Sequence, residues 1–386
     1  MSNLKEWLPV LGLALASFIF VSSEFSPVGL LPQIAETLNE SEAKTGLIMT
    51  AYAWCVAIVS LPMMLLTAKI ERRFLITALL FVFSVGNLLV GLSSEFYTIM
   101  GARLLIAFVH ALFWAISVPL ATRVAPYGKY SYGLSTVSAG VTLAIVLGMP
   151  LGKYIGDQYG WHSTFFTISG TAFLIMVVIR IILPKLPSSN AGNLKSIPEL
   201  FRNKAIVAAY FTVLFMVTGH FTLYTYIVPF LSNISNFDEN ISTILLFVYG
   251  LSGIVGILIS NKFMDKSMRE LLIISTIFVI VPILLIFLVS KSLVGVTAVL
   301  VVWSVASTLF GINMNLWVLK LAPKSTDAAM ALYSGIFNIG IGSGALFGGI
   351  TIDTLGLSNI GYIGALFIMP TVFLVYLFAQ NFKKTS

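Results

Sequence analysis

Two ionisable side chains lie inside long apolar segments of the sequence, where charged groups are rare. Glu24 lies within the apolar stretch 8–31, and Arg103 lies within the stretch 98–122. A charged side chain costs about 2.5–3.5 kcal/mol at the centre of a bilayer on insertion scales, so each indicates a function or a buried partner. Both residues lie in the outer half of their predicted spans, so their depths in the membrane are compatible. A structural ion pair and a functional pair are therefore both open interpretations.

Arg103 shares a helix face with three further side chains that do not suit lipid. His110, Trp114 and Ser117 follow it at spacings of 7, 4 and 3, which places all four within about 60° on a helix. Burial favours a neutral carboxyl group, whereas a neighbouring arginine favours the charged form. We predict that Glu24 carries a coupling proton, that His110 assists it, and that Arg103 modulates it. A packing role for His110 is the alternative.

The second half of the chain offers neutral hydrogen-bonding groups instead of embedded charges. Hydroxyl, amide and imidazole groups beside aromatic rings suit a neutral, polyhydroxylated ligand, although Asn and Ser side chains can equally join helices. The residues that we expect to bind substrate are Tyr52, Trp54, His110, Trp114, His220, Tyr224, Asn313, Ser334 and Asn338.

The composition determines which class of protein holds these residues. Of 386 residues, 58% are hydrophobic and only 10% are charged, with a mean hydropathy of +0.99. Soluble domains are about 25% charged, so most of this surface must face lipid. The single cysteine and three scattered histidines predict no disulfide framework, metal site or cofactor. No phosphate-binding loop motif occurs, and a membrane-embedded enzyme would need paired carboxylates. We expect a transporter that binds no nucleic acid.

Twelve segments are long enough to cross a bilayer as helices. This predicts an all-α membrane protein with twelve transmembrane helices. The expected spans are 8–31, 45–67, 74–92, 98–122, 131–155, 162–183, 205–231, 241–260, 271–290, 293–319, 329–352 and 359–380.

The connections between these spans divide by charge and by length. One alternating set holds 18 basic residues and the other holds 3, so the positive-inside rule places both termini in the cytoplasm. The longest polar connection, 184–204, separates halves of equal span number, 1–183 and 205–386. Arg123-Val-Ala-Pro126 also recurs as Lys320-Leu-Ala-Pro323. We therefore predict two pseudo-symmetric six-helix bundles joined by a cytoplasmic linker.

Glycines concentrate in the fifth and eleventh spans. Gly140, Gly148, Gly152 and Gly156 repeat at intervals of 8, 4 and 4, and Pro150 adds an expected kink. Small residues allow close helix contact, so these segments could form a moving seam or simply pack tightly. We expect Gly148, Pro150 and Gly152 to contribute to gating.

Several motifs resemble the major facilitator superfamily, and more closely its bacterial sugar efflux transporters within the drug:proton antiporter branch. The resemblance covers essentially the whole chain. It rests on Ser23-Glu24-Phe25, Val28–Leu31, Ala51–Trp54, Ile70–Arg73, Ala107–Ala111 with Phe113-Trp114, Ser334–Gly340, Arg103 at the helix-four motif and Gly148–Gly152 at the helix-five motif.

The resemblance implies the major facilitator fold, alternating access, and export of arabinose-like sugars or thiogalactosides against proton entry. It also implies a bacterial inner-membrane location and a monomer, with sugar, protons and lipid as partners. The loop motif between helices two and three departs from the family pattern. Ala68 replaces the usual Asp and Glu71 replaces a Gly, while Lys69, Arg72 and Arg73 remain as expected gating residues.

Two other transport functions remain open. A multidrug:proton antiporter of the same fold would use an apolar, adaptable cavity, which the 29 Phe and 13 Met residues could line. A passive facilitator is the other alternative, and the embedded Glu, Arg and His residues argue against it.

Overall fold

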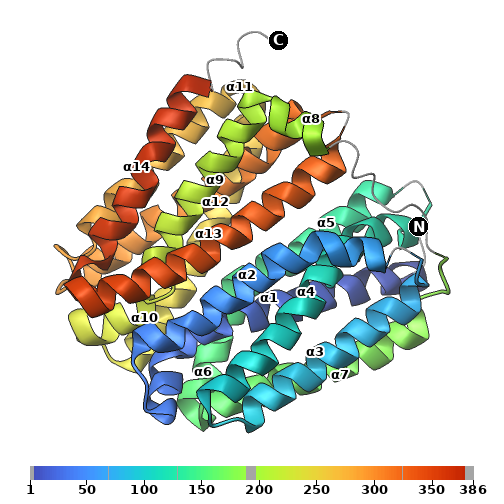
Figure 1. Ribbon diagram of the computed structural model, residues 1–386, viewed down its shortest axis with the longest axis horizontal. Helices are drawn as coiled ribbons and strands as arrows, with labels where there is room; N and C mark the ends of the chain where they lie inside the picture. Colours follow the sequence, from blue (N-terminus) through green and yellow to red (C-terminus); the bar gives the residue numbers. More distant parts are fainter. Residues whose placement is uncertain (1–3, 68, 128, 188–196, 324, 379–386) are drawn as a thin grey trace. The chain divides into compact units, whose positions relative to one another are not determined.

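The computed structural model describes residues 4–67, 69–127, 129–187, 197–323 and 325–378 (Figure 1). All regular structure in these ranges is helical. Helices arise because apolar segments in lipid must satisfy every backbone group internally. The first half holds α1 (Leu4–Leu38), α2 (Glu42–Leu66), α3 (Arg72–Leu92), α4 (Phe96–Val124), α5 (Tyr130–Leu143), the π-helix η1 (Ala144–Gly148), α6 (Met149–Tyr159) and α7 (Trp161–Ile182).

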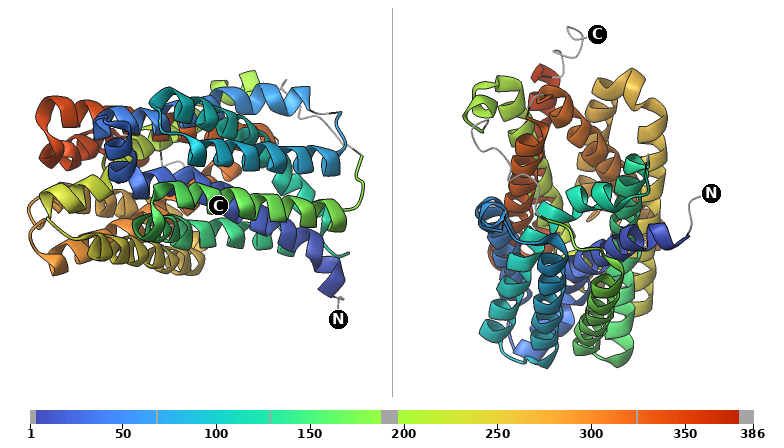
Figure 2. Two further views of the ribbon diagram at one scale, coloured as in Figure 1. Left: turned by 90° about the horizontal axis from the view of Figure 1, so that it is seen from below. Right: turned by 90° about the vertical axis from the view of Figure 1, so that its right-hand side faces the viewer.

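The second half begins with a short helix and combines long helices with several short ones, and Figure 2 shows the structure from two further sides. It holds α8 (Ile197–Arg202), α9 (Lys204–Tyr224), α10 (Ile227–Pro229), the π-helix η3 (Phe230–Ile234), α11 (Glu239–Leu285), α12 (Leu293–Leu321), α13 (Thr326–Leu355), the 3-10 helix η4 (Leu357–Asn359) and α14 (Ile360–Phe378).

Within these described ranges, twelve helical segments are long and apolar enough to cross a membrane, which confirms the predicted number of spans. One local expectation was wrong. Residues 261–270 were expected to form a loop, but they are helical, so α11 carries two spans in one continuous helix. In the fifth span, where a kink was expected at Pro150, the π-helix η1 separates α5 from α6 just before that proline. Pro150 lacks an N–H group for the carbonyl of Val146, and a π-helical turn accommodates that loss.

The chain divides into two compact units. The first comprises Met1–Glu40 and Cys55–Gly192, and the second comprises Ser41–Trp54 and Asn193–Ser386. The amino-terminal part of α2 thus packs with the second unit. The central part of the predicted linker, 188–196, lies outside the described residues.

Each unit contains a pair of helices that approach closely through glycines. In the first unit, a Cβ added at Gly148 would lie 2.5 Å from Ser22 Oγ, and one at Gly152 would lie 2.9 Å from Ser26 Oγ. Both contacts join the fifth span to α1. In the second unit, a Cβ at Gly344 would lie 2.5 Å from the Thr218 carbonyl oxygen, which joins α13 to α9. The fifth span thus packs on the first helix of its unit, as the eleventh span packs on α9.

Candidate functional site

Arg103 on α4 is fully buried and bonds to the backbone of α1. Its Nη1 donates to the Ser23 carbonyl at 2.8 Å, and its Nη2 donates to the Glu24 carbonyl at 3.2 Å. The residue four positions after Ser23 is Pro27, which has no N–H group to offer that carbonyl within the helix. The arginine therefore supplies the donor that Pro27 removes from the helical ladder.

The carboxylate of Glu24 faces the imidazole of His110. Glu24 Oε2 lies 3.7 Å from His110 Nε2, and the two residues are only 7% and 2% exposed. Arg103 also interacts electrostatically with both groups. The structure therefore brings together the three residues that the sequence predicted to act on a proton, from α1 and from one face of α4.

The same nitrogen of His110 has a second partner. Trp114 Nε1 donates to His110 Nε2 at 2.7 Å. An indole nitrogen can only donate, so Nε2 acts as an acceptor in this arrangement and the imidazole is neutral. A proton arriving on Nε2 would displace the indole and form an ion pair with Glu24. Protonating Glu24 instead would leave the Trp114–His110 bond in place.

Residues from α1 and α3 support this site. Ser23 Oγ donates to Asn87 Oδ1 at 2.8 Å, and Asn87 Nδ2 donates to the Phe83 carbonyl. The ring of Phe20 stacks on Phe113 and also contacts His110 edge-on. Asn87 was missed in the sequence because a single Asn in an apolar helix gives no sign of its partner.

In the second unit, His220 and Tyr224 join an aromatic cluster with Tyr249 and Trp303. The ring of His220 lies 5.2 Å from that of Tyr224 and 5.0 Å from that of Trp303. Tyr249 of α11 contacts both Tyr224 and Trp303 at 5.3 Å. Only His220 and Tyr224 were expected at this place. The spacing within one helix could not reveal partners that lie on α11 and α12.

The expected substrate-binding residues of α12 and α13 hydrogen-bond within their own helices or to α11. Asn313 is fully buried and donates to Ser260 Oγ at 3.3 Å and to the Leu309 carbonyl. Asn338 Nδ2 donates to the carbonyl of Ser334.

Two residues of α2 complete the expected set. Tyr52 is buried, whereas Trp54 is 37% exposed and donates to the Ile339 carbonyl at 3.4 Å. No hydrogen bond recorded within the described ranges links these residues of α2 or the two asparagines to His220.

The structure also reveals a buried ion pair that was missed in the sequence. Lys153 on α6 bonds both carboxylate oxygens of Asp157, at 2.8 and 2.7 Å, and Gln33 Nε2 donates to the same carboxylate at 2.6 Å. Glu24 and Arg103 are therefore not alone as embedded charges. Lys153 lies near the end of the predicted span 131–155, where a basic side chain is expected to reach the outer surface. Its i, i+4 spacing to Asp157 was the available signal.

The loop between α2 and α3 forms hydrogen bonds with the segment that follows α7. Glu71 accepts hydrogen bonds from the backbone N–H groups of Arg73, Phe74 and Leu186, at 2.8, 2.9 and 2.8 Å. The Arg72 N–H donates to the Leu186 carbonyl, and Arg73 Nη1 donates to the Leu183 carbonyl. Arg72 and Arg73 thus lie at this junction and Lys69 is exposed beside it, while Ala68 lies outside the described residues.

Glu71 is held in its charged form by these contacts. Desolvation raises the pKa of Glu71, but the three amide donors and the Arg73 charge together outweigh it and lower the pKa below its usual range. Because the folded pKa is lowered, the stabilisation is present above the ordinary carboxyl pKa. It is lost only as the pH falls through the lowered value.

We expect Glu71→Ala to loosen residues 183–187 and expose the Lys185–Leu186 bond to trypsin. The change removes acceptors for three amides. Because the carboxylate is partly solvated, the loss is about 1 kcal/mol, or about fivefold faster cleavage. Glu95→Ala is the matched control, since Glu95 also precedes a helix of this unit but makes no capping hydrogen bond. Equal cleavage rates in both variants would contradict this role for Glu71.

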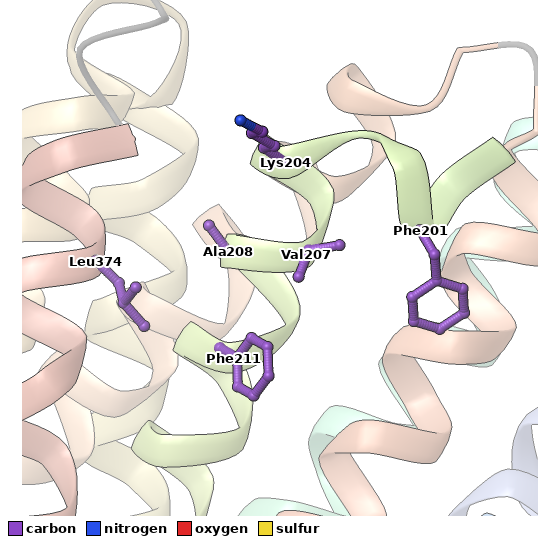
Figure 3. Close-up of a pocket in the computed structure, with 6 residues that line it drawn as sticks. All are labelled: Phe201, Lys204, Val207, Ala208, Phe211 and Leu374. Carbon is purple, nitrogen blue, oxygen red and sulfur yellow. The ribbon is translucent and has the colours of Figure 1, made fainter. Parts of the chain in front are cut away.

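A groove in the second unit lies at the start of α9, beside α8 and α14 (Figure 3). Its lining is apolar except for Lys204, and it contains none of the residues expected to bind substrate. The lining residues are Phe201, Lys204, Val207, Ala208, Phe211 and Leu374. This chemistry does not suit a polyhydroxylated ligand. Within the described ranges, no group of three or more His, Cys, Asp or Glu side chains could hold a metal ion.

Comparisons with known proteins agree with this architecture. The family model described as Major Facilitator Superfamily matches residues 13–328. A Helicobacter pylori (strain ATCC 700392 / 26695) protein named "Probable sugar efflux transporter" is 43% identical over 373 residues, which cover 96% of this chain and 95% of that protein.

Two solved structures share the fold at low sequence identity. They are crystal structures of a bacterial homolog of the human lysosomal transporter Spinster, inward-facing, one unoccupied and one occupied. Their TM-scores are 0.82 and 0.80 at 15% identity, covering 100% of this chain and 99% of theirs. At that identity, the likeness concerns the fold alone.

Proposed function

This chain belongs to the major facilitator superfamily, and we propose on that premise that it exports sugars in exchange for protons. It is a multi-pass membrane transporter rather than an enzyme, and its relative is named a sugar efflux transporter. One observation supports the coupling part of the proposal: Glu24 and Trp114 both face the same nitrogen of His110, Nε2.

The proposed coupling uses two protonation states of the Glu24 carboxyl group beside the His110 imidazole. In the first, His110 Nε2 accepts from Trp114 and the proton occupies the Glu24 carboxyl. In the second, the proton has left Glu24, and its carboxylate is stabilised by the nearby Arg103 guanidinium. Sugar binding favours one arrangement and proton binding favours the other, so that each ligand promotes release of its counterpart during alternating access.

The substrate class rests on the relative's name and on the neutral groups of the second unit. His220, Tyr224 and Trp303 offer aromatic faces and nitrogen atoms that suit arabinose-like sugars or thiogalactosides. We place the protein in the bacterial inner membrane with both termini in the cytoplasm, because 18 basic residues lie in one set of connections and 3 in the other.

The exchange can be tested in proteoliposomes with labelled arabinose or a labelled thiogalactoside. Vesicles acidified inside should accumulate sugar, because protons leaving the lumen drive sugar inward through a reversible antiporter. Vesicles acidified outside should not, and a protonophore should abolish the difference. Uptake driven by outside acid would indicate symport. Movement of a lipophilic cation without sugar movement would favour the multidrug antiporter.

A further inference from the structure

His220 has two hydrogen-bonding neighbours on α12 that face the same ring nitrogen. Trp303 Nε1 donates to His220 Nδ1 at 3.1 Å, and Ser307 Oγ lies 3.3 Å from that atom. Trp303 and Ser307 are one helical turn apart, so they project from one face of α12 toward α9. Because an indole nitrogen can only donate, Nδ1 must be unprotonated. In a neutral imidazole, the hydrogen then resides on Nε2.

The surroundings hold this arrangement in place. Trp303 is fully buried and packs against the rings of Tyr224 and Tyr249. Tyr249 also hydrogen-bonds to Ser307, and Ser304 of α12 donates to the Tyr249 carbonyl. Packing and hydrogen bonds therefore hold His220, Trp303 and Ser307 in position between the helices α9, α11 and α12.

The second ring nitrogen of His220, Nε2, is not bonded by Trp303 or Ser307. His220 is half-buried, whereas Trp303, Tyr224 and Tyr249 are buried. No hydrogen bond to His220 Nε2 is recorded within the described part of the chain. An N–H donor in a fixed direction beside the Tyr224 ring is the chemistry that a hydroxyl oxygen of a sugar requires.

We propose that Trp303 and Ser307 are positioning residues that hold His220 as an Nε2–H donor for a hydroxyl group of the substrate. The inference rests on the proposed sugar transport. It also separates the two histidines by role. In His110 the indole occupies Nε2, the nitrogen that faces Glu24, whereas in His220 the indole occupies Nδ1 and leaves Nε2 for the substrate.

Nitrogen-15 NMR of protein labelled at histidine tests the tautomer without any transport assay. The chain has three histidines, so subtracting the spectrum of His220→Gln identifies the His220 signals. We expect the Nε2–H tautomer in the wild type and a mixture in Trp303→Phe, which keeps a ring but loses the donor. Trp161→Phe is the control, because it removes another buried indole bond, to Thr37 Oγ1 at 2.9 Å. Unchanged His220 signals in Trp303→Phe would overturn the inference.

Transport kinetics test the donor role. Trp303→Phe should raise the KM for sugar about tenfold, equivalent to about 1.4 kcal/mol, while Vmax changes little. His220→Gln retains an N–H donor and should have a lower KM than His220→Leu, a comparison that leaves Trp303 intact. Equal KM values for these two variants would overturn the donor role. A wild type that shows the expected tautomer but moves no sugar would refute the proposed function and the donor role, leaving only the tautomer assignment.

Discussion

Glu24→Gln is expected to abolish proton-driven sugar accumulation while leaving the exchange of labelled for unlabelled sugar intact. Gln has nearly the shape of Glu but cannot take up or release a proton. A pH gradient of one unit stores about 1.4 kcal/mol per proton, which sustains about a tenfold concentration ratio for one-to-one exchange. In the variant this ratio should fall to about one. The measurement is the steady-state ratio of labelled sugar inside and outside acid-loaded proteoliposomes.

Two comparisons make the Glu24 experiment decisive. Glu36→Gln removes an exposed carboxylate from the same helix, α1, and should keep the wild-type ratio. Sugar exchange without a gradient reports whether the Glu24 variant still folds and alternates. A tenfold ratio that persists in Glu24→Gln would show that the coupling proton binds elsewhere. Asp157, the carboxylate of the buried Lys153–Asp157 pair, would then be the next candidate to examine.

The sequence predicted the elements well because lipid imposes a simple rule on them. Apolar segments of sufficient length must be helical, and the twelve predicted spans correspond to the twelve found in the part of the chain that the structure describes. The proximity of Glu24, Arg103 and His110 was also predictable, because helical spacing places residues on faces and the cost of burial requires partners. Within one helix or one depth, such arguments are reliable.

The contacts between helices were not predictable in the same way. Trp303 and Ser307 bond His220 from a helix more than 80 residues away in the chain, and no periodicity reveals such a pairing. Glu71 was noticed only as a departure from a motif, since its partner, the Leu186 N–H, lies in an irregular segment. The π-helix before Pro150 arises from a carbonyl without a donor. This local adjustment cannot be distinguished from a simple kink in the sequence.

Arg103→Met is expected to abolish transport and to destabilise the protein, and Pro27→Ala should restore part of the stability. The single change removes a buried cation beside Glu24, which costs about 3–5 kcal/mol. It also leaves the Ser23 carbonyl without the donor that lies 2.8 Å away in the wild type. An unpaired buried acceptor accounts for about 1–3 kcal/mol of that loss. Alanine at position 27 would provide an N–H group for this carbonyl within the helix.

The double variant should therefore recover about 1–3 kcal/mol in a double-mutant cycle, while transport stays absent because the charge is still missing. The measurement is the melting temperature in detergent, followed by tryptophan fluorescence, with sugar exchange assayed on the same preparations. Pro32→Ala is the control. It removes another proline from α1, but the carbonyl it affects is that of Val28, which is not one of the two bonded by Arg103. Additive effects of Arg103→Met and Pro27→Ala, or equal rescue by Pro32→Ala, would contradict this account. If Pro27→Ala restored stability but not transport, the two functions of Arg103 would be separated. Its guanidinium completes the hydrogen bonding of a helix that a proline interrupts, and its charge serves the proton site.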